Sequence, residues 1–147
     1  MDHLEIPRPE VWEARREWYE SHIFHYEELG SYLVGEQACA LIIDTQACFC
    51  AGAWASVIVV SFAVIEAHIR ETNPGSSKKQ SHILLEERGF GERVQSLRKL
   101  RNSLVHAKHG APALTVDQQW DERDKLEVIA TEAVSIMFEI FYSDPGT

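Results

Sequence analysis

The 21 residues 45–65, TQACFCAGAWASVIVVSFAVI, contain no charged side chain and lie between Asp44 and Glu66. This length matches a membrane-spanning helix. However, polar residues, Gly52 and five alanines dilute the hydrophobicity of the run, and no basic residues flank it. We therefore expect no membrane as a partner. A helix that is apolar on all sides belongs at the centre of a helical bundle or across a subunit interface.

Small side chains recur through this run at steps of four residues, namely at Ala47, Ala51, Ala55, Val59, Ala63 and Ala67. Residues four apart share one face of a helix. Such a face lets another backbone approach closely, while Trp54 and Phe62 fill space elsewhere. We expect a neighbouring helix to pack against this stripe.

The rest of the chain is also patterned for helices. Apolar residues at helical spacing predict three helices, over residues 10–29, 36–43 and 82–87. A further helix should begin at Glu92 and stop at Gly110 and Pro112. The last helix should begin at Thr115 and carry an apolar stripe that ends at Phe141. The segment 66–72 should carry the central helix into solvent before Asn73-Pro74-Gly75 stops it. No stretch alternates as a strand does. The predicted fold is all-α, an antiparallel bundle of about four to five helices.

Composition indicates one globular domain over residues 1–147, with 45% apolar and 25% charged residues. The net charge of −9 opposes attraction to phosphate backbones, so a nucleic-acid site would have to be a local basic patch. Residues 88–108 contain such a cluster, in which Glu92 is the only acid. Its six cationic residues are Arg88, Arg93, Arg98, Lys99, Arg101 and Lys108.

The cysteines and the first residues predict a cytoplasmic protein. Cysteine occurs three times, at Cys39, Cys48 and Cys50, and an odd number does not suggest a disulfide framework. The start MDHLEIPRPE lacks the basic and apolar regions of a signal peptide. The two-residue spacing of Cys48 and Cys50 is not that of a zinc site, so we expect buried thiols.

Two pairs of histidines stand three residues apart, His22 with His25 and His106 with His109. This spacing could in principle place two nitrogens on one metal ion. The sequence puts no carboxylate or thiol partner beside either pair. We therefore expect no metal and no cofactor.

The segment LRNSLVH, residues 100–106, could carry chemistry. It contains a permanent cation at Arg101, an amide at Asn102 and a titratable imidazole at His106. Arginine can clamp a phosphate and stabilise developing charge, and histidine can transfer a proton near neutral pH. These groups suffice for metal-free RNA cleavage, in which the ribose 2′-hydroxyl attacks its own phosphorus.

The spacing of Arg101 and His106 presents a geometric difficulty. Residues five apart on a regular helix point about 140° from each other. Two such helices facing each other across a two-fold axis would surround one groove with both residues from both subunits. We therefore expect the site to form in a homodimer.

The motif and its setting resemble the HEPN superfamily (higher eukaryotes and prokaryotes nucleotide-binding), which is marked by Arg, a polar residue and a His four to six positions after the Arg. Here the motif reads RNSLVH. The segment ASVIVVSFAVIEAHIRE is similar to the family's long central helix, and LRKLRNSLVHAKHG to its motif helix. The resemblance covers residues 32–142.

This resemblance implies a metal-independent endoribonuclease at a dimer interface, usually within a toxin–antitoxin or other defence system. Arg101 would bind and polarise the scissile phosphate, and His106 would transfer the proton. Asn102 would bind the phosphate or orient its neighbours, and Glu66 would position Arg101. In the branch paired with nucleotidyltransferase antitoxins, Tyr stands two positions after His. This chain has Lys108 there, which leaves the identity of any antitoxin open.

Arg98, Lys99 and Lys108 are expected to guide an RNA substrate electrostatically. A competing interpretation gives Arg101 and His106 only a role in complementing the helix dipole. The chain would then be a catalytically inactive helical interaction or RNA-binding module of a defence or regulatory complex. A sensor of a small molecule or nucleotide is a third possibility, because fold does not specify function.

Overall fold

The chain folds into helices, as the sequence predicts. A computed structural model describes residues 4–146, which form seven α-helices, one short 3-10 turn at Ser76–Lys78 and no strand beyond the isolated bridge of Tyr32 with Pro145. The helices are α1 (Pro9–Leu29), α2 (Glu36–Ala51), α3 (Trp54–Glu71), α4 (Ser81–Glu87), α5 (Glu92–Val105), α6 (Val116–Asp121) and α7 (Arg123–Phe141). The all-α prediction is confirmed.

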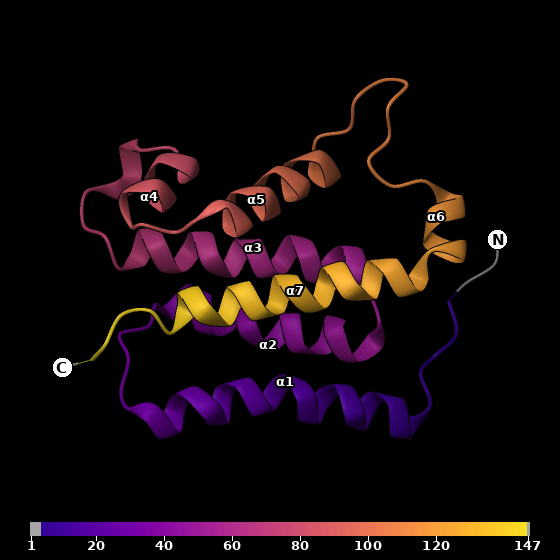
Figure 1. Cartoon of the computed structure of the whole chain (residues 1–147), viewed down its shortest axis with the longest axis horizontal. Coiled ribbons are helices and arrows are strands. Elements are labelled where there is room, and N and C mark those ends of the chain that lie inside the picture. The colour runs from indigo at the N-terminus through magenta and orange to yellow at the C-terminus, as the bar shows by residue number, and fades with distance from the viewer. Residues whose placement is uncertain (1–3, 147) are drawn as a thin grey trace.

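Helix α3 lies inside the bundle, with α2, α7 and α5 packed around it (Figure 1). Successive long helices run in opposite directions, so α1, α3 and α7 point one way and α2 and α5 the other. The neighbours α3 and α7 are therefore parallel, because α6 and the loop before it return the chain to the end where α3 began. None of the described helices is both long and apolar enough to cross a membrane.

The uncharged run does not form the single helix that its composition predicts. Helix α2 continues past the predicted end at residue 43 to Ala51, and Gly52 then adopts a left-handed conformation with φ of 76°. Its N–H donates to the carbonyls of Cys48 and Phe49 and closes the last turn. The chain reverses and α3 begins at Trp54. The predicted stripe of small residues is therefore wrong, because its first two members lie on α2 and the others on α3.

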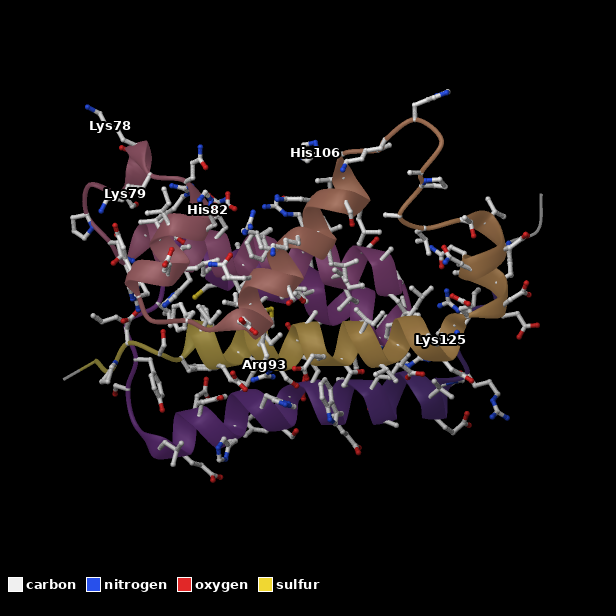
Figure 2. The ribbon with its side chains drawn as sticks, turned by 45° about the horizontal axis from the view of Figure 1, so that its top comes forward. Lys78, Lys79, His82, Arg93, His106 and Lys125 are labelled. Carbon is white, nitrogen blue, oxygen red and sulfur yellow. The ribbon has the colours of Figure 1, made fainter. Side chains whose placement is uncertain are left out.

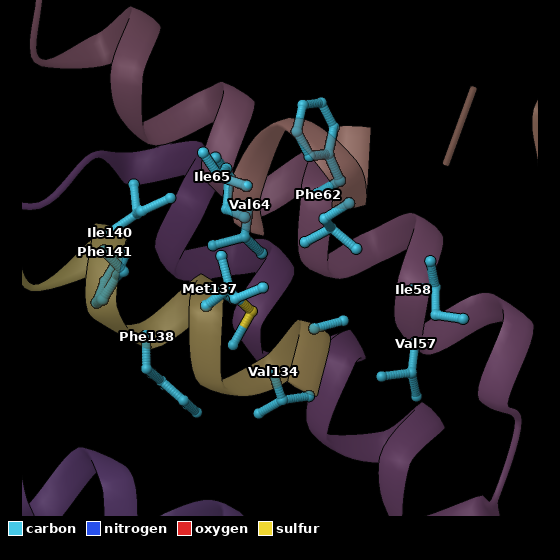
Figure 3. Close-up of a cluster of buried hydrophobic side chains, with 14 of the residues drawn as sticks. Val57, Ile58, Phe62, Val64, Ile65, Val134, Met137, Phe138, Ile140 and Phe141 are labelled. Atoms are coloured by element: carbon cyan, nitrogen blue, oxygen red, sulfur yellow. The ribbon is translucent and has the colours of Figure 1, made fainter. Parts of the chain in front are cut away.

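The core lies mainly between α3 and α7 (Figure 3). Phe62, Val64 and Ile65 of α3 and Met137 and Phe138 of α7 belong to this core, all without solvent exposure. Burying side chains of this size contributes about 1.5–3 kcal/mol each. The predicted face of α7 is confirmed for most of its members, of which Ala133, Ile136, Met137, Ile140 and Phe141 are buried.

Three other predictions about burial are wrong. Ile129 is 40% exposed on α7, because the buried face begins one residue later at Ala130. The segment 66–72 does not leave the core, since its residues 67–69 are buried and the His68 ring lies 5.7 Å from the Phe141 ring of α7. Among the thiols only Cys50 is buried; Cys48 is half-buried and Cys39 is exposed. Burial nevertheless raises the pKa of all three thiols above the ordinary value.

His68 links α3 to the segment after α7. Its side chain is fully buried, and its Nε2 lies 2.9 Å from a carboxylate oxygen of Asp144. An ionised carboxylate can only accept, so Nε2 carries the proton and donates it. The opposite nitrogen Nδ1 is buried without a hydrogen-bond partner. Asp144 also accepts from Arg88 at 2.6 Å.

These contacts set the ionisation of both groups. Burial lowers the pKa of His68 despite the hydrogen bond to Asp144, because a proton on Nδ1 would find no acceptor. Burial alone would raise the pKa of Asp144, but the hydrogen bond and charge of Arg88 hold it below the ordinary value. At neutral pH the contact thus joins a neutral imidazole to a carboxylate.

We predict that the protein loses stability when the pH falls from 7 to 5. The pKa of His68 is lower in the folded chain than in the unfolded chain, so the unfolded chain binds more protons below about pH 6.5. The depressed pKa of Asp144 adds a further loss below about pH 4. Urea unfolding at several pH values should show a flatter slope between pH 7 and 5 for His68→Gln. The exposed control His25→Gln should retain the wild-type slope, and equal slopes in all three proteins would contradict the prediction.

The N-terminus of α2 is capped from the end of α3. The carboxylate of Glu71 accepts hydrogen bonds from the backbone N–H groups of Gln37 and Ala38 at 3.0 and 3.1 Å. These donors have no partner within their own helix, and the negative charge also complements the helix dipole. Gly35 leaves the space that this carboxylate fills, since a Cβ on Gly35 would collide with the Glu71 side chain.

We predict that Glu71→Ala lowers the free energy of unfolding by about 1 kcal/mol, as expected for the loss of a capping side chain. Chemical denaturation measures this change. Glu86→Ala is the matched control, because Glu86 is an exposed carboxylate on α4 for which the described residues offer no ion pair. Equal losses in the two variants would show that the hydrogen bonds to α2 contribute nothing.

Candidate active site

Helix α5 carries the RNSLVH motif and packs against α3 through Val94 and Leu97, with Leu100 and Leu104 partly buried beside them. The helix ends at Val105, although the sequence predicted that it would continue to Gly110 and Pro112. One more helical turn after Leu104 would place Lys108 on the face that packs against the core. Because lysine gains nothing from burial there, apolar packing does not stabilise the helix beyond this point. His106 is therefore the residue after the helix, with φ of −120° and ψ of 83°.

Arg101 is held against α3. Its guanidinium carbon lies 4.6 Å from the centre of the Phe62 ring, and its Nη2 lies 3.4 Å from a carboxylate oxygen of Glu66. The side chain is 24% exposed, and Nε is buried without a hydrogen-bond partner. The structure thus brings the predicted pair Glu66 and Arg101 together across two helices.

Glu66 also connects two residues that the sequence did not predict. Ser81, at the start of α4, donates to the same carboxylate oxygen at 2.7 Å. Arg70 lies 3.9 Å from the other oxygen of Glu66 and donates to the Ser81 hydroxyl at 3.2 Å. The i,i+4 spacing of Glu66 and Arg70 could have indicated their contact. No sequence signal links Ser81 to them, because the loop before α4 positions it.

We predict that Glu66 and Arg101 are energetically coupled. A double-mutant cycle with alanine at both positions should give a coupling energy of about 1 kcal/mol, at the upper end for pairs with some exposure. The control is the pair Arg93 and Glu132, whose side chains are more than half exposed and should give a value near zero. Unfolding in urea provides the four free energies of each cycle. A coupling no larger than that of the control would contradict a specific contact.

His106 and Asn102 lie differently from Arg101. His106 is exposed beyond the end of α5, far along that helix from Arg93 at its start (Figure 2). Its backbone N–H donates to the carbonyl of Asn102 at 2.9 Å, and the Asn102 side chain is half-buried. Among the hydrogen bonds of the described residues, none joins Arg101 to His106. A single chain therefore presents the two groups separately.

The basic patch predicted over residues 88–108 is much less positive than its sequence suggests. Carboxylates from α3, from α7 and from the segment after α7 pair with three of its six cations. Asp144 binds Arg88, Glu132 and Glu139 bind Arg93, and Glu66 binds Arg101. The remaining three are Arg98, Lys99 and Lys108. For these, no carboxylate of residues 4–146 lies within ion-pair distance; Arg98 instead donates to Gln95 at 2.9 Å.

A groove of about 420 Å³ adjoins the end of α5. Ala55, Ser56, Val59 and Val60 of α3 form one wall, and Ser103, Leu104 and the loop 107–114 supply most of the rest. Most of its lining is small or apolar. Within residues 4–146, no group of three or more His, Cys, Asp or Glu side chains is arranged to hold a metal ion.

Comparisons with family models, with curated proteins and with solved structures found no match to the chain.

Proposed function

We propose that this protein is a metal-independent endoribonuclease whose active site forms in a homodimer. The observation that carries the proposal is the fixed position of Arg101, whose guanidinium is held between the Phe62 ring and the Glu66 carboxylate. Five residues later the exposed imidazole of His106 is free to reach a substrate. An anchored phosphate clamp and an accessible proton-transfer group, which a two-fold axis can bring together, are the minimum needed for cleavage by the 2′-hydroxyl.

The proposed reaction uses these groups in defined roles. The 2′-oxygen forms a bond to phosphorus, the bond from phosphorus to the 5′-oxygen breaks, and His106 transfers the proton between the two oxygens. Arg101 stabilises the charge that develops on the phosphate oxygens. Asn102, on the exposed side of the same turn, hydrogen-bonds the phosphate or orients its neighbours. Glu66 acts as a positioning residue because it orients Arg101 and keeps its charge in place.

Dimerisation would bring the separated groups together. The groove between α3 and α5 lies beside the motif, and its small side chains, among them Ala55 and Val59, allow a second copy to approach closely. A two-fold axis there would place Arg101 of one subunit near the partner's His106. Arg98, Lys99 and Lys108, which lack carboxylate partners, would then attract single-stranded or looped RNA to the same side.

We propose further that this ribonuclease acts as a toxin or defence effector, restrained by an antitoxin or regulatory protein. The resemblance of the RNSLVH segment and of the central helix to HEPN domains supports this role. The alternative is a catalytically inactive RNA-binding or interaction module. That alternative is favoured by one contact, since the ion pair with Glu66 already engages the guanidinium of Arg101 within the folded chain.

We predict that the purified protein cleaves single-stranded RNA in the presence of EDTA. Arg101→Ala and His106→Ala should each lower the rate by about 100-fold or more, the range typical for losing an acid–base group or a charge-stabilising donor. His109→Ala and Arg93→Ala are matched controls that should retain the wild-type rate. Absence of cleavage by the wild type, or cleavage that persists in both motif variants, favours the inactive module.

Mixing the two inactive variants tests whether the site is shared between subunits. A heterodimer of Arg101→Ala and His106→Ala contains one site in which both groups are intact, so it should recover about half of the wild-type activity per dimer. Subunit exchange followed by the same assay measures this recovery. If the site lay within one chain, the mixture would stay inactive.

A further inference from the structure

A second site candidate lies at the end of the bundle near the described N-terminal residues. There the segment before α1, the reversal between α2 and α3, and the α6–α7 junction come together (Figure 1). They line an open cleft of about 990 Å³, which is more than twice the volume of the groove beside α5. Its apolar walls include Leu4, Ile6, Val11 and the partly exposed Trp120.

Two arginines converge at the base of this cleft. Arg15 from α1 donates to the carbonyl of Cys50 at 3.2 Å, and Arg123 from α7 donates to the carbonyl of Gly52. Their guanidinium carbons lie 4.8 and 6.0 Å from the centre of the same Trp54 ring. A nitrogen of each lies within 3.5 Å of the point where a side chain on Gly52 would begin.

These two like charges have no carboxylate to separate them. Within residues 4–146 no carboxylate lies within ion-pair distance of Arg15, Arg123 or the nearby Arg8, and Glu5 is the only acidic residue that lines the cleft. Burial and the charge of Arg15 lower the pKa of Arg123, and the charge of Glu127, which lies beyond ion-pair distance, offsets only part of this. In a chain with a net charge of −9, where most other arginines pair with acids, this arrangement is exceptional.

Capping of α2 accounts for only part of this arrangement. One cation at the C-terminus of a helix complements its dipole and its last carbonyl groups. Each guanidinium carries five N–H donors. Arg15 uses one of them on a carbonyl, and Arg123 uses one on Gly52 and one on Gln119. The donors that remain, with a large adjoining cleft, suit an anion that can accept from both side chains.

We propose that this cleft binds a small molecule that carries a phosphate group and an aromatic or apolar portion. Arg15 and Arg123 would hold the phosphate through paired hydrogen bonds, which the planar guanidinium favours. Arg8 would add positive charge at the rim, and Trp120 with the apolar walls would contact the rest of the ligand. The volume lies at the upper end of the range for small-molecule sites, so a ligand of mononucleotide size fits.

The test is a titration of the full chain, labelled with ¹⁵N, with inorganic phosphate, AMP and adenosine at constant ionic strength. We expect AMP to cause saturable shifts of the Trp120 indole and the Gly52 amide. Phosphate should bind more weakly because it lacks the aromatic portion, and adenosine should bind weakest because it lacks the anion. Arg15→Gln and Arg123→Gln should each weaken AMP binding about tenfold or more, because each substitution removes one or two charge-assisted hydrogen bonds to the phosphate.

Control variants separate binding from folding and from RNA cleavage. Arg93→Gln, which removes an exposed arginine elsewhere, should bind AMP as the wild type does. Trp120→Ala should weaken the binding of AMP but not of phosphate, and it leaves the cap of α2 intact. Thermal melts show whether each variant is folded. Arg101→Ala should bind AMP normally, so this result is independent of the proposed ribonuclease activity.

Several outcomes would overturn the proposal. The first is that neither phosphate nor AMP causes saturable shifts. The second is that adenosine binds as tightly as AMP. The third is that folded Arg15→Gln and Arg123→Gln bind AMP as the wild type does. Loss of AMP binding in Arg101→Ala with retention in Arg123→Gln would also overturn it, because the nucleotide would then bind at α5.

Discussion

The architecture depends on the burial of α3, a helix that has no polar face along most of its length. Most of such a helix must be covered, and α2, α7 and α5 bury it except along the open groove lined by Ala55, Ser56, Val59 and Val60. Two of its polar side chains have specific partners, which offset part of the cost of burial, whereas the Ser61 hydroxyl is buried without a partner in the described structure. Glu66 reaches α4 and α5, and His68 reaches the segment after α7. The helix that supplies the core thus also positions the polar contacts.

Long-range ion pairing determines which positive charges can attract a ligand. Around α5, carboxylates from α3, α7 and the C-terminal segment pair with three of the arginines and leave Arg98, Lys99 and Lys108 unpaired in the described structure. At the end of the bundle beside the segment before α1, Arg15 and Arg123 have no ion-pair partner among residues 4–146 and share one aromatic ring. Both candidate sites therefore offer positive charge to an anion, and only the site at α5 coincides with the cationic stretch 88–108.

Arginine stacked on an aromatic ring recurs at both candidate sites, with different consequences. At α5 the Phe62 ring and the Glu66 carboxylate hold a single guanidinium in one orientation, which suits a clamp that acts on a transient charge. At the bundle end Trp54 supports two guanidinium groups for which residues 4–146 provide no ion-pair partner, which suits a stably bound anion. The two sites therefore lend themselves to different tasks, cleavage at the first and ligand binding at the second.

The fold class and the approximate positions of most helices follow from sequence, because helical periodicity is a local property. The contact of Glu66 with Arg101 is instead what the resemblance to HEPN domains implies. The reversal at Gly52 does not follow from sequence, since both arms of the hairpin are equally apolar and only packing reveals that the chain turns back. The end of α5 before His106 depends in the same way on where the core stops supporting that helix. Ser81 beside Glu66, and Arg15 beside Arg123, are 15 and 108 residues apart in sequence from their partners. Contacts over such separations arise from the packing of whole helices, and the spacing of residues within one helix does not predict them.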